Sequence, residues 1–177
     1  MLTALILLLP AARAGNTGAA ADRPVEHNTL ARSPDGIGIG AMLGLPIALS
    51  VAWKPHLEGV WGQGQFGWDF TSGTMAAGAD VLYTLTTLHA PDIQDFSFPF
   101  YVGVGPRLRL GVSTSIYAPS AIALRVPVGM CFYHTAVPIE GFLEAAPSIG
   151  LAPGLGEKLN RWRGGFDFVI GGRFFLP

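Results

Sequence analysis

The sequence predicts an all-β fold, a closed antiparallel up-and-down barrel of eight strands with one face toward a membrane. Two observations favour it. Apolar side chains recur at every second residue through eight segments, which is the period of a β-strand. The charged residues inside those segments fall on the opposite parity, so each predicted strand has one apolar and one polar face. Eight strands form the smallest closed barrels of outer membranes.

Composition agrees with this class of fold. The chain has 177 residues, enough for one domain, and is 50% hydrophobic but only 13% charged. It contains no run of about 18 apolar residues, so no transmembrane helix is predicted. Instead, 24 glycines and 14 prolines separate short apolar segments. The net charge of -1 and the lack of a basic cluster argue against nucleic acid as a partner.

The amino-terminal residues have the pattern of a secretory signal peptide. Residues 2–10 are apolar and are followed by Ala-Arg-Ala at 12–14, an A-x-A cleavage site, although no basic residue precedes the apolar run. We expect a cleavable signal peptide over 1–14, a flexible lead-in over 15–35 and the barrel over 36–177, with export to the outer membrane. The alternatives are a translation start further upstream, or a buried strand or helix in place of the signal.

Four strands are predicted in the first half of the chain. In the first, the odd positions are apolar and most even positions are glycine, and Pro46 turns the chain into the second. The second alternates large apolar residues with Ala, Ser and Lys. The third has aromatic residues opposite two glutamines, and a Thr-Ser-Gly turn separates it from the fourth. These strands are residues 36–45, 47–54, 59–70 and 74–88.

Four more strands follow a polar connection at residues 89–97. The fifth alternates Val and Leu with Gly and Arg, and the sixth has apolar even positions opposite Arg125 and Pro127. Because a proline removes a hydrogen-bond donor from the strand ladder, we expect a bulge at Pro127. The seventh is the least regular, and the eighth alternates aromatic residues with Arg and Asp. These strands are residues 98–111, 121–134, 138–149 and 161–176.

The same alternation fits two kinds of barrel. In a soluble, lipocalin-like barrel the apolar face points inward and holds an apolar ligand, whereas in a membrane barrel it points toward lipid. The bulky side chains of eight long strands exceed what a narrow interior can hold, so we favour the membrane barrel. Its predicted aromatic girdles are Trp53, Phe100, Phe132 and Phe174 at one rim, and Trp68, Phe70 and Trp162 at the other.

Ten charged side chains are predicted to point into the barrel, five of each sign. Balanced charges can pair across the interior, and Glu140 and Glu144 are the expected partners of Arg125. Two roles remain open for this network: an ion-pair plug that fixes the register of the strands, or a narrow, gated ion path. The predicted network consists of Lys54, Asp69, Asp80, Arg107, Arg109, Arg125, Glu140, Glu144, Asp167 and Arg173.

Glycine repeats at residues 36–40 and 62–64 imitate part of a nucleotide-binding fingerprint, but no helix is predicted after them. We predict instead that they are small residues of the barrel interior, where they let larger side chains fit. Gly129 is also assigned to the interior, and Gly129→Ser is expected to be mild. Val128 is assigned to the lipid face, where Val128→Arg would destabilise the inserted barrel by about 2–4 kcal/mol.

No residue pattern predicts catalysis, a metal site or a cofactor. His27, His56, His89 and His134 lack metal-ligand spacing, and none is expected near the serines of the outer turns. We therefore predict that the protein is not an enzyme. Cys131, the single cysteine, is expected to be an inert residue that faces inward.

Several motifs in this order resemble a family of small bacterial outer-membrane β-barrels first noticed in spirochaetes. They are GIGIGAMLGLP, DVLYTL, FYVGVGPRLRLG, RVPVG and PIEGFLEAAPSIGLAP, followed by a Gly- and Phe-rich end. The resemblance extends over residues 36–175 and implies an eight-stranded barrel similar in architecture to other small outer-membrane barrels. The family has no settled biochemical activity, so the resemblance implies no catalytic or binding residues.

The predicted partners are outer-membrane lipid, the outer-membrane assembly machinery, and a surface ligand. The connections from Val112 to Ser120 and from Gly150 to Asn160 are the places where such a ligand would bind. We expect a monomer that binds no nucleic acid. Eight strands leave too little space for a general porin. The predicted role is therefore structural or in surface interaction, with ion conduction or binding of an apolar ligand as the alternatives.

Overall fold

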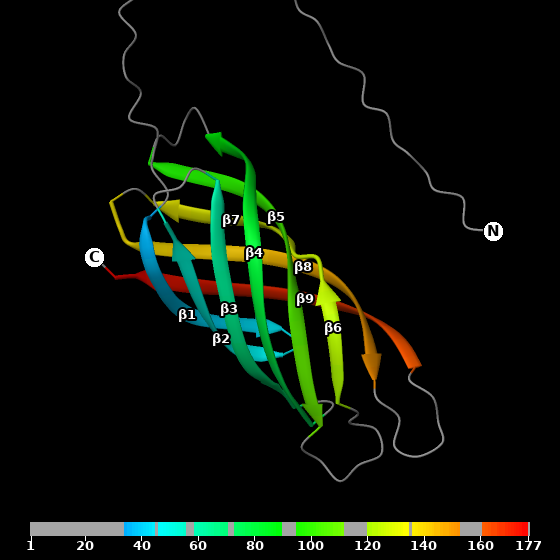
Figure 1. Ribbon diagram of the computed structural model, residues 1–177. Coiled ribbons are helices and arrows are strands. Elements are labelled where there is room, and N and C mark those ends of the chain that lie inside the picture. The colour runs from blue at the N-terminus through cyan, green and yellow to red at the C-terminus, as the bar shows by residue number, and fades with distance from the viewer. Residues whose placement is uncertain are drawn as a thin grey trace, which may run out of the picture. The chain divides into compact units, whose positions relative to one another are not determined.

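The computed structural model describes residues 34–44, 46–55, 59–70, 73–89, 95–111, 120–134, 136–152 and 161–176. These residues form nine β-strands and no helix, so none of the described segments is a helix that could cross a membrane (Figure 1). The predicted signal peptide, nearly all of the lead-in and most of the two proposed ligand-binding connections lie outside the described residues. The strands are β1 (Gly36–Gly44), β2 (Ile47–Lys54), β3 (Val60–Asp69), β4 (Thr74–His89), β5 (Phe96–Gly111), β6 (Ala121–Arg125), β7 (Val128–His134), β8 (Ile139–Ala152) and β9 (Arg161–Phe175).

The strands pair in a closed ring with eight positions. Successive strands are neighbours, β9 pairs with β1, and β6 and β7 together occupy the position between β5 and β8. Every pairing is antiparallel. The prediction of an all-β antiparallel arrangement with eight strand positions is therefore confirmed. The ninth strand arises because the predicted strand 121–134 is divided at Val126 and Pro127.

Pro127 interrupts this strand without a bulge, so the predicted bulge is wrong. Val102 of β5 pairs with Val128, and Gly105 pairs with Arg125, so the same number of residues separates the two pairs on each strand. The amide of Gly103 donates to the Pro127 carbonyl at 2.8 Å. Since Pro127 has no N–H, only the reciprocal bond is missing, and the register continues unchanged.

Two other prolines are accommodated in the same part of the ring. Pro106 points outward from β5, and the pairing of β4 with β5 is interrupted there but resumes in the same register. Pro147 of β8 accepts a hydrogen bond from the amide of Val126 at 2.9 Å. Each proline therefore removes a ladder donor without displacing its neighbours.

Some strand ends differ from those predicted. β4 continues to His89 and β5 begins at Phe96, so the predicted polar connection at 89–97 is shorter than expected. A register shift between Thr84 and Thr86 gives β4 a bulge before this extension. β8 likewise continues to Ala152.

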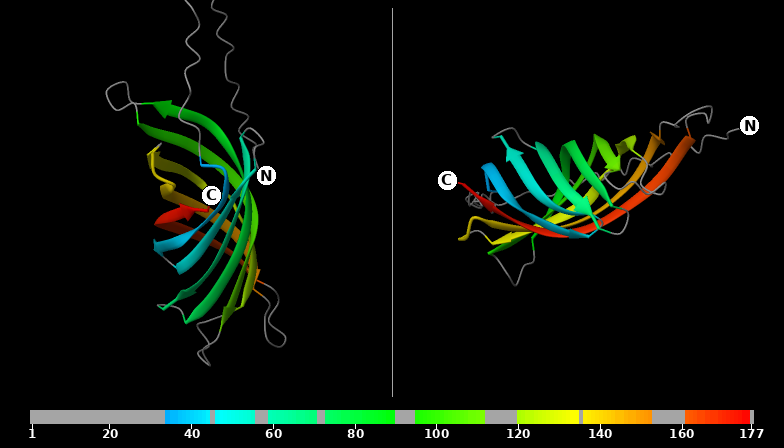
Figure 2. Two further views of the ribbon diagram at one scale, coloured as in Figure 1. Left: turned by 90° about the vertical axis from the view of Figure 1, so that its left-hand side faces the viewer. Right: turned by 90° about the horizontal axis from the view of Figure 1, so that it is seen from below.

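Closure of the ring requires a stagger between the strands. The series of paired residues that starts at Gln65 and crosses β4, β5, β6 and β8 ends at Arg163 on β9. The series that starts at Gln65 and runs in the other direction, across β2 and β1, ends at Arg173, which lies ten residues after Arg163 on the same strand. A stagger of this kind tilts the strands against the ring axis, and Figure 2 shows the curved, oblique strands that result.

The two faces of the sheet carry opposite kinds of side chain. Thirty-three large apolar side chains of the described residues are exposed, and most lie on the outward parity of the strands. Eight charged side chains are buried instead, all on the inward parity. The observed faces therefore separate large apolar groups from charges, and the charges lie inside the ring.

Candidate functional site

The buried charges inside the ring form the candidate site. Of the ten residues predicted for the network, eight are nearly inaccessible, and Arg109 and Asp69 are half-buried on β5 and β3. The ion pairs among the described residues divide nine of these ten into three clusters. We call them the first cluster (Lys54, Glu140 and Arg173), the central cluster (Asp80, Arg125 and Glu144) and the mouth cluster (Arg107, Arg109 and Asp167).

The first cluster lies at the end of the ring where β1 begins and β9 ends. Glu140 accepts hydrogen bonds from Lys54 Nζ and from Arg173 Nη1, the latter at 3.1 Å. Arg173 Nε also donates to Ser50 Oγ at 3.0 Å, and its guanidinium lies 4.0 Å from the centre of the Phe142 ring. Both cations are thus held by a carboxylate and by an aromatic face.

Aromatic rings complete the surroundings of Lys54. Its Nζ lies 4.8 Å from the Trp61 ring centre and 5.3 Å from that of Phe175. Trp61 in turn packs edge-on against Tyr101, with ring centres 5.1 Å apart. These contacts join the first cluster to the polar groups further inside.

The central cluster is organised around Arg125. Its Nη2 donates to Glu144, and its Nη1 lies 3.7 Å from Asp80 Oδ2. Glu144 Oε2 also accepts from Gln63 Nε2 at 3.1 Å and from the Tyr101 hydroxyl at 3.0 Å. Glu144 therefore has three donors, one of which is charged.

One of the two predicted partners of Arg125 is correct. Glu144 bonds to Arg125, but Glu140 bonds to Lys54 and Arg173. The register explains the difference: Arg125 pairs with Ser148, and Glu140 lies eight residues before Ser148, near the start of β8, a separation along the strand of roughly 26 Å. No arginine side chain spans that distance.

The mouth cluster lies nearest the opposite end of the ring. Asp167 Oδ2 accepts from Arg107 Nη1, and Asp167 Oδ1 accepts from Arg109 Nη2 at 3.0 Å. Arg107 is buried, whereas the side chain of Arg109 is 36% exposed. One carboxylate thus holds two guanidinium groups at the boundary between the interior and the end of the ring.

Formal charge alternates from cluster to cluster. The first and mouth clusters each contain two cations and one carboxylate, whereas the central cluster contains one cation and two carboxylates. An anion entering from either end would be attracted first and then repelled at the centre, and a cation would be repelled at both ends. An ion of either sign that enters the ring therefore meets charged groups of both signs in turn.

Inward glycines make room for these long side chains. A Cβ added at Gly105 would lie 2.4 Å from Asp80 Oδ1 and 2.0 Å from the Ala79 carbonyl oxygen. A Cβ at Gly129 would lie 2.5 Å from the Tyr101 hydroxyl. Asp80 and Tyr101 can therefore extend across the neighbouring strand only because that strand has glycine beneath them.

Not all of the predicted interior glycines face inward. Gly38 and Gly40 have the inward parity, and a Cβ at Gly38 would meet the Phe175 ring at 2.7 Å. Gly62 and Gly64 alternate with the buried Trp61, Gln63 and Gln65, so they face outward, and their assignment to the interior was wrong. A Cβ at Gly64 would have no heavy atom within 4 Å.

Several polar residues contribute to the network that the predicted set did not include. They are Ser50, Gln63, Gln65 and Tyr101, all on the inward parity of β2, β3 and β5. Their inward parity could have identified these residues from the sequence. They were missed because the prediction counted only charged residues. Five buried atoms around the central and mouth clusters have no hydrogen-bond partner among the described residues: Gln65 Oε1, Asp80 Oδ1, Arg107 Nε, Arg125 Nε and Arg125 Nη1.

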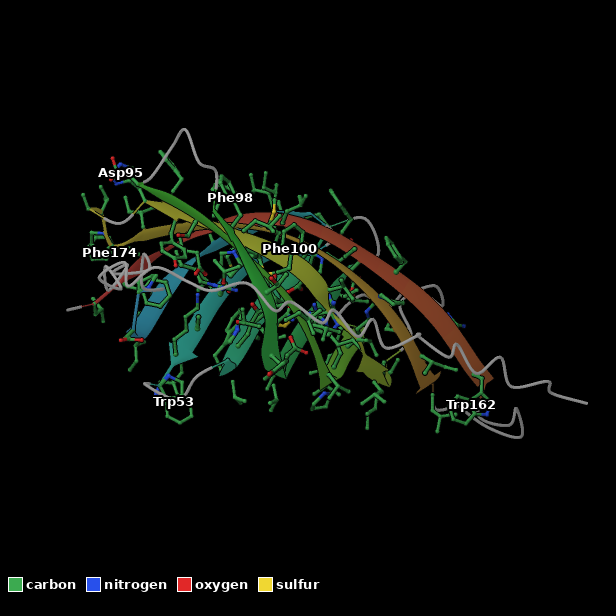
Figure 3. The ribbon with its side chains drawn as sticks, turned by 90° about the horizontal axis from the view of Figure 1, so that it is seen from above. Trp53, Asp95, Phe98, Phe100, Trp162 and Phe174 are labelled. Carbon is green, nitrogen blue, oxygen red and sulfur yellow. The ribbon has the colours of Figure 1, made fainter. Side chains whose placement is uncertain are left out.

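The aromatic residues assigned to the girdles lie on the outward parity. Trp53 and Trp162 are 60% and 70% exposed. Figure 3 shows Trp53 and Phe174 toward one end of the strands and Trp162 at the other end. Trp68 packs against Phe70, with ring centres 6.3 Å apart. The remaining two, Phe100 and Phe132, occupy outward positions on β5 and β7.

Of the four histidines, the structure describes His89 and His134, and it also describes the single cysteine, Cys131. His134 Nδ1 accepts from the Ala136 amide at 3.1 Å, and its ring lies edge-on to Phe96. His27 and His56 lie outside the described residues, and His89 ends β4. Cys131 is buried with a free thiol. Within the described ranges, no three His, Cys, Asp or Glu side chains are grouped to hold a metal ion.

Comparison with known proteins adds no assignment. No family model, no curated protein and no solved structure matches the chain. The resemblance to small outer-membrane barrels therefore stays a prediction.

Proposed function

We propose that the protein is an eight-stranded β-barrel of a bacterial outer membrane, with an interior closed by ion pairs. The observation that carries the proposal is the inside-out distribution of side chains. Large apolar groups cover the outward face, while eight charged groups are buried inside the ring. A folded protein in water has the reverse arrangement, whereas a barrel in lipid needs an apolar outer band and permits a polar interior.

Backbone pairing supports the same proposal. Each strand position has a partner on both sides, so the ring has no free edge. In lipid, unpaired backbone groups are costly, and a closed ring of strands is one of the two arrangements that satisfy them. Exposed Trp53 and Trp162 near opposite ends fit the two interfaces of a bilayer.

The role that fits this interior is structural or in surface interaction, without catalysis. Buried ion pairs fill the space that an apolar ligand would occupy in a lipocalin-like barrel. The alternating cluster charges oppose ion flow, which argues against a constitutive pore. Such a protein would then act through contacts made by its outer face and its connections, or by supporting the mechanical integrity of the membrane.

Two measurements test the proposal. In cells that make the full chain, we expect the protein in the outer-membrane fraction, with a gel mobility that changes when the sample is boiled. A soluble protein with unchanged mobility would contradict the membrane assignment. In planar bilayers, we expect neither the wild type nor Arg125→Ala to conduct, since removal of one cation leaves the other clusters in place. Wild-type channels whose selectivity changes in Arg125→Ala would contradict the closed interior.

A further inference from the structure

Three arginines gather at the end of the ring that contains the mouth cluster. Arg107 and Arg109 lie on β5, and Arg163 lies on β9. The register relates them: Arg107 pairs with Ala123, Ala123 with Gly150, and Gly150 with Arg163. The two residues between Arg107 and Arg163 in this row of paired residues are Ala123 and Gly150, whose side chains are a methyl group and a hydrogen. Guanidinium groups from both sides can therefore extend over a part of the interior that carries no other large side chain in that row.

Among the described side chains at this end, the carboxylates do not balance the arginines. Asp167 is bonded to both Arg107 and Arg109, and Asp69 is half-buried on β3 at the same end. Arg163 is exposed and forms no ion pair with a described residue. The described side chains of this mouth thus comprise three cations and two anions, an excess of one positive charge within this described set.

Arg107 also has a hydrogen-bond donor without an acceptor among the described residues. The residue is 2% exposed, and its Nε has no hydrogen-bond partner among the described residues although Nη1 bonds to Asp167. A buried guanidinium N–H without an acceptor is unfavourable, and an acceptor that reaches it relieves the cost. Arg109, which is part-exposed beside it, offers further donors toward the end of the ring.

We infer that this mouth binds an anion of the phosphate class, with Arg109 and Arg163 as its outer ligands and Arg107 as the inner one. Phosphate presents several acceptor oxygens at once, and the planar fork of arginine matches that geometry. Its source can be free phosphate or the phosphate monoester of a lipid headgroup. The inference depends on the ring and not on a bilayer, so it can fail while the membrane proposal stands.

The test is a titration of the full mature protein, folded in non-ionic micelles, with inorganic phosphate at constant ionic strength. Nuclear magnetic resonance reports on the Nε–H groups of the arginines. We expect saturable shifts of Arg107, Arg109 and Arg163, and an affinity about tenfold lower in Arg163→Gln and in Arg109→Gln, the size of one charge-assisted hydrogen bond. Lys54→Gln, which removes a cation at the opposite end, is the matched control and should bind phosphate as the wild type does.

Two results would overturn the inference. One is an equal response to chloride and phosphate, which indicates general screening. The other is unchanged affinity in Arg163→Gln, a variant expected to fold normally because Arg163 is exposed. A second titration uses mixed micelles that contain a lipid phosphate monoester, with the same lipid lacking the phosphate as the control. Shifts at lower phosphate concentration with the monoester identify the headgroup as the source, and shifts with inorganic phosphate alone identify the free anion.

Discussion

The inner and outer faces of the ring are made by the same strands but are specified in different ways. Inside, each charged group has particular partners at particular distances, as Glu144 has Arg125, Gln63 and Tyr101. Outside, the described Val, Leu, Ile and aromatic side chains alternate along the strands, and ring packing such as that of Trp68 on Phe70 is the kind of contact found there. The inner face therefore depends on the identity of each residue, and the outer face depends mainly on apolar character. Substitutions on the two faces should differ accordingly.

The largest expected effect comes from the centre of the inner face. Arg125→Leu leaves the Glu144 and Asp80 carboxylates buried without their cation. We expect a loss of about 3–5 kcal/mol in the free energy of unfolding, because an uncompensated buried charge is strongly unfavourable. Urea unfolding in lipid vesicles, followed by tryptophan fluorescence, measures it.

A triple variant with Arg125, Glu144 and Asp80 all changed to Leu provides the control for that measurement. It removes the unpaired charges and should recover much of the loss, since apolar groups can replace buried ion pairs. If Arg125→Leu alone costs under about 1 kcal/mol, the ion pairs are exchangeable with water and the inner face is not specified by its partners.

The outer face is tested by a charge in its middle. Val128 on β7 is 50% exposed, and Val128→Arg should cost about 2–4 kcal/mol if that exposure is to lipid. The same substitution at Val137, which is exposed in the turn between β7 and β8, should cost much less, because a long side chain near the rim reaches water. Equal and small effects at both positions, measured by the same unfolding assay, would mean that the outer face meets water.

The alternation of side chains made the strands and their faces predictable from the sequence. A period of two assigns each residue to a face, and turn residues separate the strands, so the eight positions of the ring followed directly. The effect of Pro127 did not follow, because the register depends on the neighbouring strands: Gly103 still donates to the Pro127 carbonyl. Parity, applied consistently, would also have assigned Gly62 and Gly64 to the outer face.

The partners of the buried charges were less predictable. Parity gives the inward direction but not the height of a residue in the ring, which depends on the stagger between strands. Glu140 and Glu144 look equivalent in the sequence, yet one belongs to the first cluster and the other to the central cluster. The contacts of the inward glycines depend on the same stagger, and the mild effect expected for Gly129→Ser is revised because Tyr101 covers that position.

The same substitution, glycine to alanine, can be made on each face, so that the effects on the free energy of unfolding can be compared directly. A methyl group at Gly105 would collide with the Ala79 carbonyl and Asp80, whereas one at Gly64 would touch nothing within 4 Å. We expect Gly105→Ala to cost about 1–3 kcal/mol through overpacking, and Gly64→Ala to be neutral or stabilising by less than about 1 kcal/mol. Similar unfolding free energies for the two variants would contradict the close contact of Asp80 with β5.

The smallest effect is expected where the inner face meets the end of the ring. Arg109→Gln removes an ion pair with Asp167, but the Arg109 side chain is 36% exposed and Asp167 keeps its bond to buried Arg107. We therefore expect a loss below about 1 kcal/mol, the range of partly solvated ion pairs. A loss as large as that of Arg125→Leu would mean that Arg109 is as integral to the interior as the central cluster. A small loss together with weaker phosphate binding would separate the two duties of the inner face: the central arginine holds the ring together, and the arginine at the mouth is available for a ligand.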